Sequence, residues 1–273
     1  MENIDPLLIL QPIIFIVMSV VAILYWRKRR GFRRILLLLS LVAYAVAIGA
    51  KVAIQAVTYT AVSDYFGTMS VGVGLYFGLQ TVFLEVGLAY LVASFAQKRV
   101  NMNASDGVAY GISLGFWENA VLLGALSLVN LIADYALIAS GSSLGQLVYN
   151  ALLNANPAYF SPPSVILPYV LIGTLERLSS LLVHVAFGTL CVLAVLTRRR
   201  RFLAYAMPMG LVDAFVPFAS LNLYVFEGGL FLLSLGFIAV AWVSMRSAGT
   251  MMASPGQPIP ESAPAAPPQP AQP

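Results

Sequence analysis

The sequence predicts an all-α polytopic integral membrane protein with about seven transmembrane helices and a polar centre near the midplane. Hydrophobic residues make up 60% of the chain, charged residues only 10%, and the mean hydropathy is +0.86. A soluble domain usually carries about 25% charged residues. The apolar residues also gather in runs that reach the roughly 20 residues needed to cross a bilayer.

Seven apolar runs are long enough to be spans. They cover residues of about 7–26, 35–57, 70–95, 107–132, 164–197, 203–222 and 229–245. We therefore expect a transmembrane helical domain over 1–248. The Pro- and Ala-rich segment 249–273 cannot bury a core and should be a disordered tail.

The longest loop, at about 133–163, contains a short amphipathic pattern. Its apolar residues recur at helical spacing, at Leu144, Leu147, Val148 and Leu152. This pattern predicts a short helix lying at the membrane interface.

Basic residues indicate how the chain is oriented. Thirteen of the fifteen Lys and Arg residues follow the first, third, fifth and seventh runs, which places them in alternate loops. Loops enriched in Lys and Arg are cytoplasmic. We expect the N-terminus outside, the C-terminus in the cytoplasm, and a multi-pass location in the plasma membrane. The net charge of +4 reflects this topology and does not indicate a nucleic-acid partner.

Several ionisable residues lie inside the predicted spans, where each costs several kcal/mol. They are Lys51, Glu85, Glu118, Glu176, Arg177, His184 and Asp213. At about 1.5 Å per residue, Glu85, Glu118 and Asp213 lie roughly 15–17 Å from the cytoplasmic face and His184 roughly 20 Å from it. Four groups on four helices at one level predict a shared site.

Small residues share helix faces with these groups. The stripes are Gly78, Thr81 and Glu85; Gly111, Gly115 and Glu118; and Gly173, Arg177, Ser180, His184 and Gly188. A small-xxx-small pair lets a neighbouring backbone approach closely, so Gly111 and Gly115 are first a packing motif. Lys51, Glu176 and Arg177 lie nearer the outer third, and we expect structural ion pairs there.

Two of the central residues have structural interpretations as well. His184 could be a neutral histidine that hydrogen-bonds a neighbouring helix. Asp213 could cap a broken helix, because Pro208 and Pro217 flank it.

Four short motifs link these positions to a known family. Glu176, Arg177 and His184 match a Glu-Arg-x6-His motif in full. Leu84-Glu85 with Leu88 looks like a glutamate pair followed by Arg. Residues 113–118 look like Gly-His-Gly-x-x-Glu, with Leu114 in place of the His. Met209 with Asp213 looks like His-x3-Asp, with Met209 in place of the His. Over most of residues 12–215 the chain resembles the YhfC-type membrane peptidases, which are related to the PrsW and CAAX-prenyl-endopeptidase group.

The resemblance implies an intramembrane endopeptidase that hydrolyses membrane-embedded or lipid-modified peptide substrates. The expected catalytic residues are Glu85, His184, Glu118 and Asp213. With a single histidine, a glutamic-type mechanism is favoured: Glu85 would activate water, and His184 would orient it or stabilise the oxyanion. Glu118 and Asp213 would hydrogen-bond His184 or shape the pocket. The alternative is a divalent metal such as zinc on Glu85, His184 and Asp213.

Two other functions are compatible with the same pattern. One is a catalytically inactive family member that acts as a membrane scaffold or chaperone. The other is a small membrane transporter or substrate-binding subunit. For all three functions one partner is the lipid bilayer. The peptidase and the scaffold would also bind a transmembrane or lipidated peptide.

Overall fold

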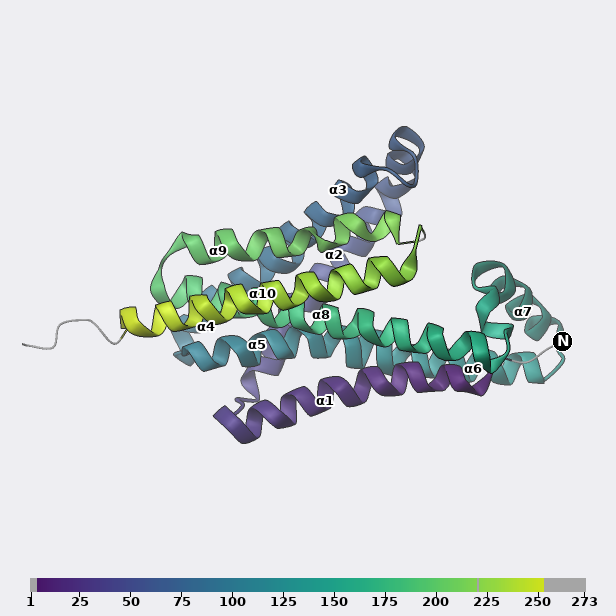
Figure 1. Ribbon diagram of the computed structural model, residues 1–273, viewed down its shortest axis with the longest axis horizontal. Helices are drawn as coiled ribbons and strands as arrows, with labels where there is room; N and C mark the ends of the chain where they lie inside the picture. The colour runs from purple at the N-terminus through teal and green to yellow at the C-terminus, as the bar shows by residue number, and fades with distance from the viewer. Residues whose placement is uncertain (1–3, 220, 253–273) are drawn as a thin grey trace, which may run out of the picture.

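The computed structural model of the protein describes residues 4–219 and 221–252, and these residues form helices joined by short connections (Figure 1). Six of the helices are long and apolar enough to cross a membrane. The prediction of an all-α polytopic membrane protein is therefore confirmed. The segment 253–273, which holds most of the expected tail, lies outside the described residues.

The six long helices correspond to six of the predicted runs. They are Pro6–Arg30 (η1 Pro6–Ile9 and α1 Leu10–Arg30), Ile35–Phe66 (α2), Val71–Val100 (α3 Val71–Gln80, η2 Thr81–Val86 and α4 Gly87–Val100), Ala104–Ala139 (α5 Ala104–Phe116, η3 Trp117–Leu126 and α6 Ser127–Ala139), Pro163–Thr197 (α8), and α10, Leu223–Met252, of which Leu223–Gly249 is the apolar span.

Most helices extend beyond the apolar runs that predicted them. The second continues to Phe66 and stops where Gly67 takes a φ of 82°, a left-handed conformation that favours glycine. The helix continues through the more polar residues 58–66 until this glycine, so hydropathy alone places the helix end too early. Similarly, α10 runs four residues past the expected domain boundary at 248.

The expected run at 203–222 is helical but irregular. It consists of α9, Arg200–Ala206, and a 3₁₀ segment η5, Met207–Phe218, with Pro208 near its start and Pro217 inside it. Proline has no N–H to donate, so a regular α-helix cannot continue through this segment. Helical structure is thus present in all seven predicted runs, although only six of them coincide with helices long and apolar enough to cross a membrane.

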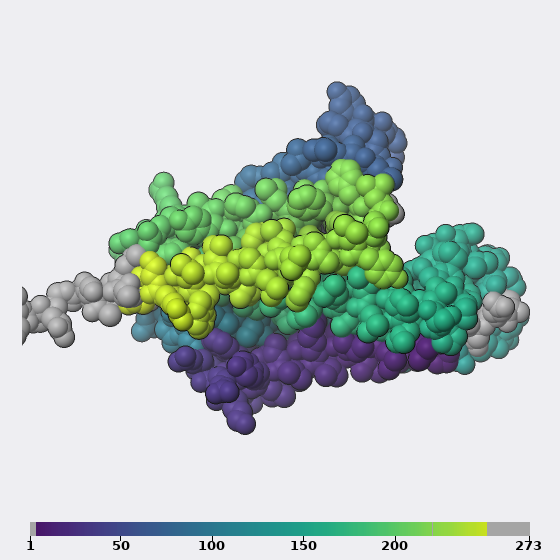
Figure 2. Space-filling view, in the orientation of Figure 1, coloured from purple at the N-terminus to yellow at the C-terminus, as the bar shows by residue number. Residues whose placement is uncertain are grey.

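The helix expected in the long loop is present as α7, Ser143–Ala155, followed by the 3₁₀ turn η4, Pro157–Phe160. Ser142 caps α7 by accepting a hydrogen bond from the Gly145 N–H at 3.1 Å. In Figure 1, α7 lies at the same end of the bundle as the start of α1. The space-filling view shows a notch between this end and the projecting α3 (Figure 2).

The central element is α8, whose apolar span is 67% buried. It packs mainly against α5 and α10. Its C-terminal half supplies Phe187, Leu190 and Leu193 to the main apolar cluster, which also contains Tyr110 of α5 and Phe202 of α9. The helices α1, α4 and α9 pack against it as well, so α8 lies at the centre of the bundle (Figure 1).

Glycines allow α5 and α8 to touch along their backbones, as the small-xxx-small pair predicts. A Cβ added to Gly111 would lie 2.6 Å from the carbonyl oxygen of His184, and one added to Gly188 would lie 2.5 Å from Gly111 Cα. Neither position has room for a side chain. This contact fixes the position of His184 relative to the helix that carries Glu118.

Substituting Gly111 tests this contact. Gly111→Ala should lower the free energy of unfolding by about 1–3 kcal/mol, because the added methyl group meets backbone atoms that cannot move independently. Thermal unfolding of the purified protein in detergent or nanodiscs would measure the effect. Gly236→Ala on α10 is the matched control, because a Cβ there meets nothing within 4 Å. Equal unfolding temperatures for the two variants would contradict the close approach.

Candidate active site

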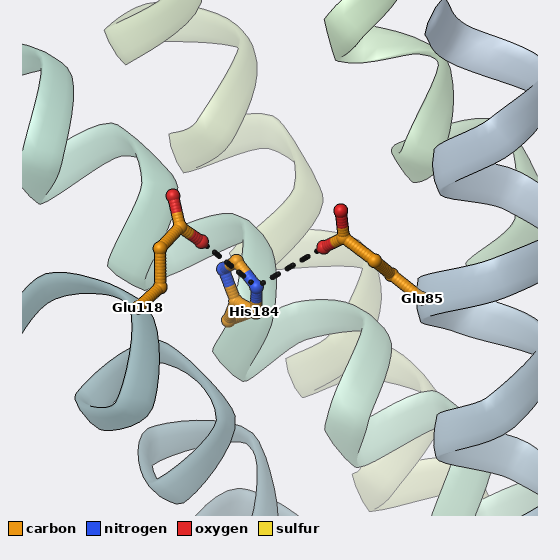
Figure 3. Close-up of side chains that lie close together, drawn as sticks. All are labelled: Glu85, Glu118 and His184. Atoms are coloured by element: carbon orange, nitrogen blue, oxygen red, sulfur yellow. Dashed lines mark ion pairs between the residues drawn. The ribbon is translucent and has the colours of Figure 1, made fainter. Parts of the chain in front are cut away.

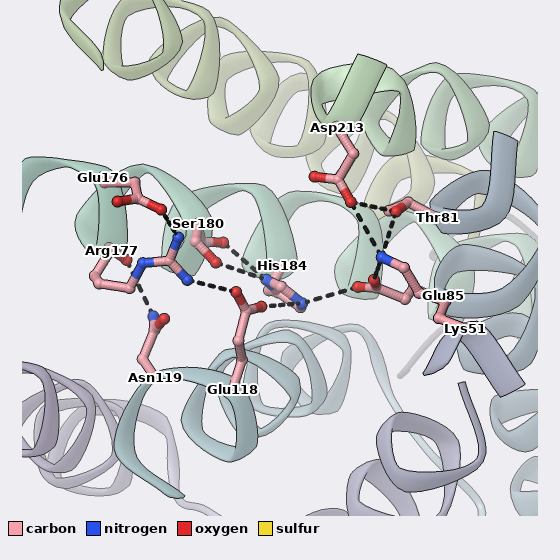
Figure 4. Close-up of polar contacts among 10 residues, drawn as sticks. All are labelled: Lys51, Thr81, Glu85, Glu118, Asn119, Glu176, Arg177, Ser180, His184 and Asp213. Carbon is pink, nitrogen blue, oxygen red and sulfur yellow. Dashed lines mark hydrogen bonds and ion pairs between the residues drawn. The ribbon is translucent and has the colours of Figure 1, made fainter. Parts of the chain in front are cut away.

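A row of alternating charges crosses the middle of the bundle (Figure 4). The Lys51 Nζ donates to Glu85 Oε1 at 2.6 Å, and Arg177 Nη1 donates to Glu118 Oε1 at 2.7 Å. His184 lies between the two carboxylates, with its Nε2 3.6 Å from Glu85 Oε2 and 3.2 Å from Glu118 Oε2. Each glutamate therefore has one oxygen on a cationic side chain and the other directed at the same imidazole (Figure 3).

The hydrogen bonds of His184 show which nitrogen is available. Its Nδ1 lies 2.9 Å from the Ser180 carbonyl oxygen. A carbonyl can only accept, so Nδ1 carries the proton in this contact. The buried Nε2 has no hydrogen-bond partner of good geometry among the described residues. A neutral imidazole would direct its lone pair at two anions, and the arrangement is favourable only if a cation lies between them.

Both glutamates lie in π-helical segments. Glu85 is in η2, Thr81–Val86, and Glu118 is in η3, Trp117–Leu126. A π turn holds more residues than an α turn and changes which side chains face a neighbouring helix, and such turns are frequent at functional sites. The spacing of small residues predicted the faces of Glu85 and Glu118, whereas the π turns were not predicted.

Three donors are close enough to hold one ion. Ligand atoms of Glu85, Glu118 and His184 all lie within 4.8 Å of one another. Two carboxylate oxygens and one imidazole nitrogen suit first-row divalent metals such as zinc or manganese. The His184 Nε2 is buried between two anions and has no hydrogen bond of good geometry to any described residue, and by this observation the three residues fit a metal.

Asp213 lies outside this set, which corrects the expected ligand group of Glu85, His184 and Asp213. Its Oδ2 accepts from Lys51 Nζ at 3.1 Å and from the Thr81 hydroxyl. Because the 3₁₀ segment η5 packs against α3 and η2, Asp213 reaches the far side of Lys51 and not the imidazole (Figure 4). Glu118 offers the third possible ligand atom in its place.

The structure also separates Lys51 from the other expected ion pair. Arg177 does contact Glu176, its neighbour on α8, and it also contacts Glu118. Lys51 was expected near this pair, but it lies at the opposite end of the row, on Glu85 and Asp213. The depth estimate placed Lys51 in the outer third, apart from Glu85 and Asp213, whereas the structure pairs it with both of these carboxylates.

A cavity of about 260 Å³ opens beside the charged row. It is large enough for several water molecules. Besides the expected groups, it is lined by residues that sequence reasoning did not single out, among them Tyr44, Phe226 and Glu227. Glu227 was missed because it precedes the last apolar run by two residues, although a carboxylate so close to a span was an available signal.

The substituted motif positions do not take part in this site. Leu114 and Met209 are each 2% exposed and belong to the main apolar cluster. Leu84 and Leu88 are half-buried on η2 and α4. The polar centre is therefore built without them.

The helical bundle and its buried charged row define a multi-pass membrane protein with a polar site enclosed among its spans. A family profile described as YhfC intramembrane metalloprotease matches residues 14–233, and the chain belongs to this family. The uncharacterized membrane protein YhfC of Bacillus subtilis (strain 168) is 34% identical over 131 residues, which are 46% of this chain and 48% of that protein. The match thus spans about half of that relative. No solved structure matches the chain.

Removing Lys51 tests whether the charged row is a coupled network. Lys51→Met should cost about 3–5 kcal/mol of stability, because Glu85 and Asp213 would be left buried without their cation. The double variant Lys51→Met with Glu85→Gln should recover part of this loss, since it removes one of the unpaired charges. Unfolding in mixed micelles would measure both. Additive losses in the double variant would contradict the coupling.

Proposed function

We propose that this protein is a metal-dependent intramembrane endopeptidase that uses Glu85, Glu118 and His184 to hold a divalent cation. The observation that carries the proposal is the buried Nε2 of His184, which lies between two carboxylate oxygens and has no hydrogen-bond partner of good geometry in the described part of the chain. Membership in a family described as intramembrane metalloproteases supports it.

The charges around the cavity support a divalent cation. Glu85, Glu118, Glu176 and Asp213 outnumber their ion-pair partners Lys51 and Arg177 by two. Uncompensated charge is costly inside a membrane. A divalent cation at His184 would restore neutrality. When bound there, it would activate a water molecule and polarise a peptide carbonyl.

The protein's own groups orient the site and move the proton. Lys51 and Arg177 hold the outer oxygens of Glu85 and Glu118, which keeps the inner oxygens directed at His184. The Glu118 side chain is 18% exposed and that of Glu85 is 9%. The Glu118 carboxylate is thus the more accessible of the two to water in the cavity. With a cation bound it is a ligand, and it would accept a proton from that water in a glutamic-type mechanism. The Nδ1–H bond to Ser180 keeps Nε2 free.

Asp213 acts through Lys51 in this proposal. It shares the lysine with Glu85 and also accepts from Thr81. It therefore positions the Lys51 ammonium group, which holds Glu85, and does not itself touch the reacting atoms.

A glutamic-type mechanism is the second candidate, and the position of His184 Nε2 between Glu85 and Glu118 favours it as well. If a proton takes the place of the metal ion on Nε2, His184 becomes an imidazolium between two carboxylates, and Glu85 or Glu118 activates the water. The two candidates use the same three residues and differ in their metal requirement.

We also propose the substrate class and the topology. The substrate is a transmembrane or lipid-modified peptide segment that reaches the cavity from the bilayer. The first turns of α10 line the cavity through Phe226 and Glu227 and border the notch seen in Figure 2. The N-terminus faces outside and the C-terminus the cytoplasm of a plasma membrane, as the basic loops indicate.

Cleavage of a membrane-embedded reporter tests the activity. Glu85→Gln, Glu118→Gln and His184→Ala should each lower the cleavage rate by at least roughly 100-fold, because each removes a group that binds or activates water. Asp134→Asn is the control: this carboxylate also lies in an apolar span, on α6, but does not line the cavity. Cleavage by purified Glu118→Gln protein at the normal rate would contradict the assigned role of Glu118.

The metal content of purified protein separates the two mechanisms. We expect roughly one divalent ion per chain, lost in His184→Ala because its Nε2 is a ligand, and retained in Asp213→Asn. Elemental analysis of protein in nanodiscs would measure it, with a chelator and metal add-back as a check on cleavage. Active protein without stoichiometric metal would support the glutamic-type mechanism instead.

A further inference from the structure

Glu227 is a buried carboxyl group that takes no part in the charged row. It lies in the first two turns of α10 and is 3% exposed. Its Oε2 is buried without a hydrogen-bond partner among the described residues. It lines the same cavity as Glu176 and Arg177, and both are close enough to interact with its charge.

The charge of the cavity suggests what Glu227 binds. Five carboxyl groups and two cationic side chains line it, at Glu85, Glu118, Glu176, Asp213, Glu227, Lys51 and Arg177. A divalent ion at His184 balances the four carboxylates of the ion-pair network. Glu227 forms no ion pair with the described residues, and a buried carboxylate without a partner is strongly unfavourable.

Glu176 provides a second oxygen-bearing group on the same side. Its side chain is 43% exposed, and only its Oε1 contacts Arg177. Nearby, Val216, Phe226 and Leu230 give the cavity an apolar wall. Lysine and arginine side chains fit such a combination, because their stems cover apolar surface while the charged end reaches a polar group.

We propose that Glu227 and Glu176 form a subsite for a basic side chain of the substrate, a primary ammonium or guanidinium group. The inference rests on the proposed function and specifies its substrate class: membrane segments with a Lys or Arg near the scissile bond. A metal ion is the less suitable occupant, since the one group of three metal-binding residues found among the described residues is Glu85, Glu118 and His184.

Peptide binding tests the subsite without cleavage. The probes are fluorescent Leu/Ala helices of about 20 residues, each with one Lys at a different position, and identical helices with Gln at that position. The protein carries His184→Ala and is reconstituted in nanodiscs of zwitterionic lipid. At one or more positions the Lys helix should bind at least roughly tenfold more tightly than its Gln counterpart, as expected for a hydrogen bond to a charged group.

Two variants of Glu227 test whether this residue causes the tighter binding of the Lys helix. Glu227→Gln should remove the preference for Lys, and Glu227→Lys should produce a preference for a Glu-containing helix. Asp134→Asn, made in the same background, should keep the Lys preference. Equal binding of Lys and Gln helices at every position would overturn the proposal, as would a Lys preference that survives Glu227→Gln.

A stability measurement excludes a purely structural role for Glu227. Glu227→Gln should leave the unfolding temperature unchanged or raise it, because it removes a buried group that lacks a partner in the free protein. A clear decrease would instead show that Glu227 holds the fold together. Because the binding assay uses a variant that does not cleave, loss of the proposed protease activity and loss of the cation subsite remain separate results.

Discussion

The cost of placing charges inside a membrane is the constraint on which this structure depends. Lys51, Glu85, Glu118 and Arg177 lie in apolar spans, and none of them could remain there alone. Each is paired with a charge from a different helix, apart from the additional contact of Arg177 with its neighbour Glu176. The ion pairs therefore require α2, η2, η3 and α8 to meet at one level.

The backbone makes this meeting possible in two ways. Glycines at α5 and α8 bring the helix backbones into contact, so that His184 reaches the Glu118 helix. The π turns at η2 and η3 then set which face each glutamate presents. The π turns lie beside the charged row, whereas the C-terminal half of α8 packs through large apolar side chains.

The result is a symmetric arrangement in which two cations hold two carboxylates on either side of one imidazole (Figure 4). Such a site has little freedom to reorganise, because the outer oxygens of both glutamates are already bonded. Preorganised charges of this kind are what hydrolysis inside a membrane requires, since the surrounding lipid cannot stabilise a developing charge. Glu227 differs from these glutamates, because its Oε2 is buried beside this cavity with no hydrogen-bond partner among the residues that the structure describes.

The sequence by itself determined the membrane-spanning helical fold, the family resemblance and the residues of the polar centre, because hydropathy, helical faces and depth are all properties of a linear pattern. Glu85, Glu118 and His184 were identified at one level by counting residues along their spans. Only the tertiary structure decided how these groups pair. It moved Asp213 away from His184, placed Lys51 at the opposite end from Arg177, and brought Glu227 into the cavity. The reason is that pairing depends on helix rotation and on local π and 3₁₀ turns, and each of these changes which neighbouring side chain a residue meets.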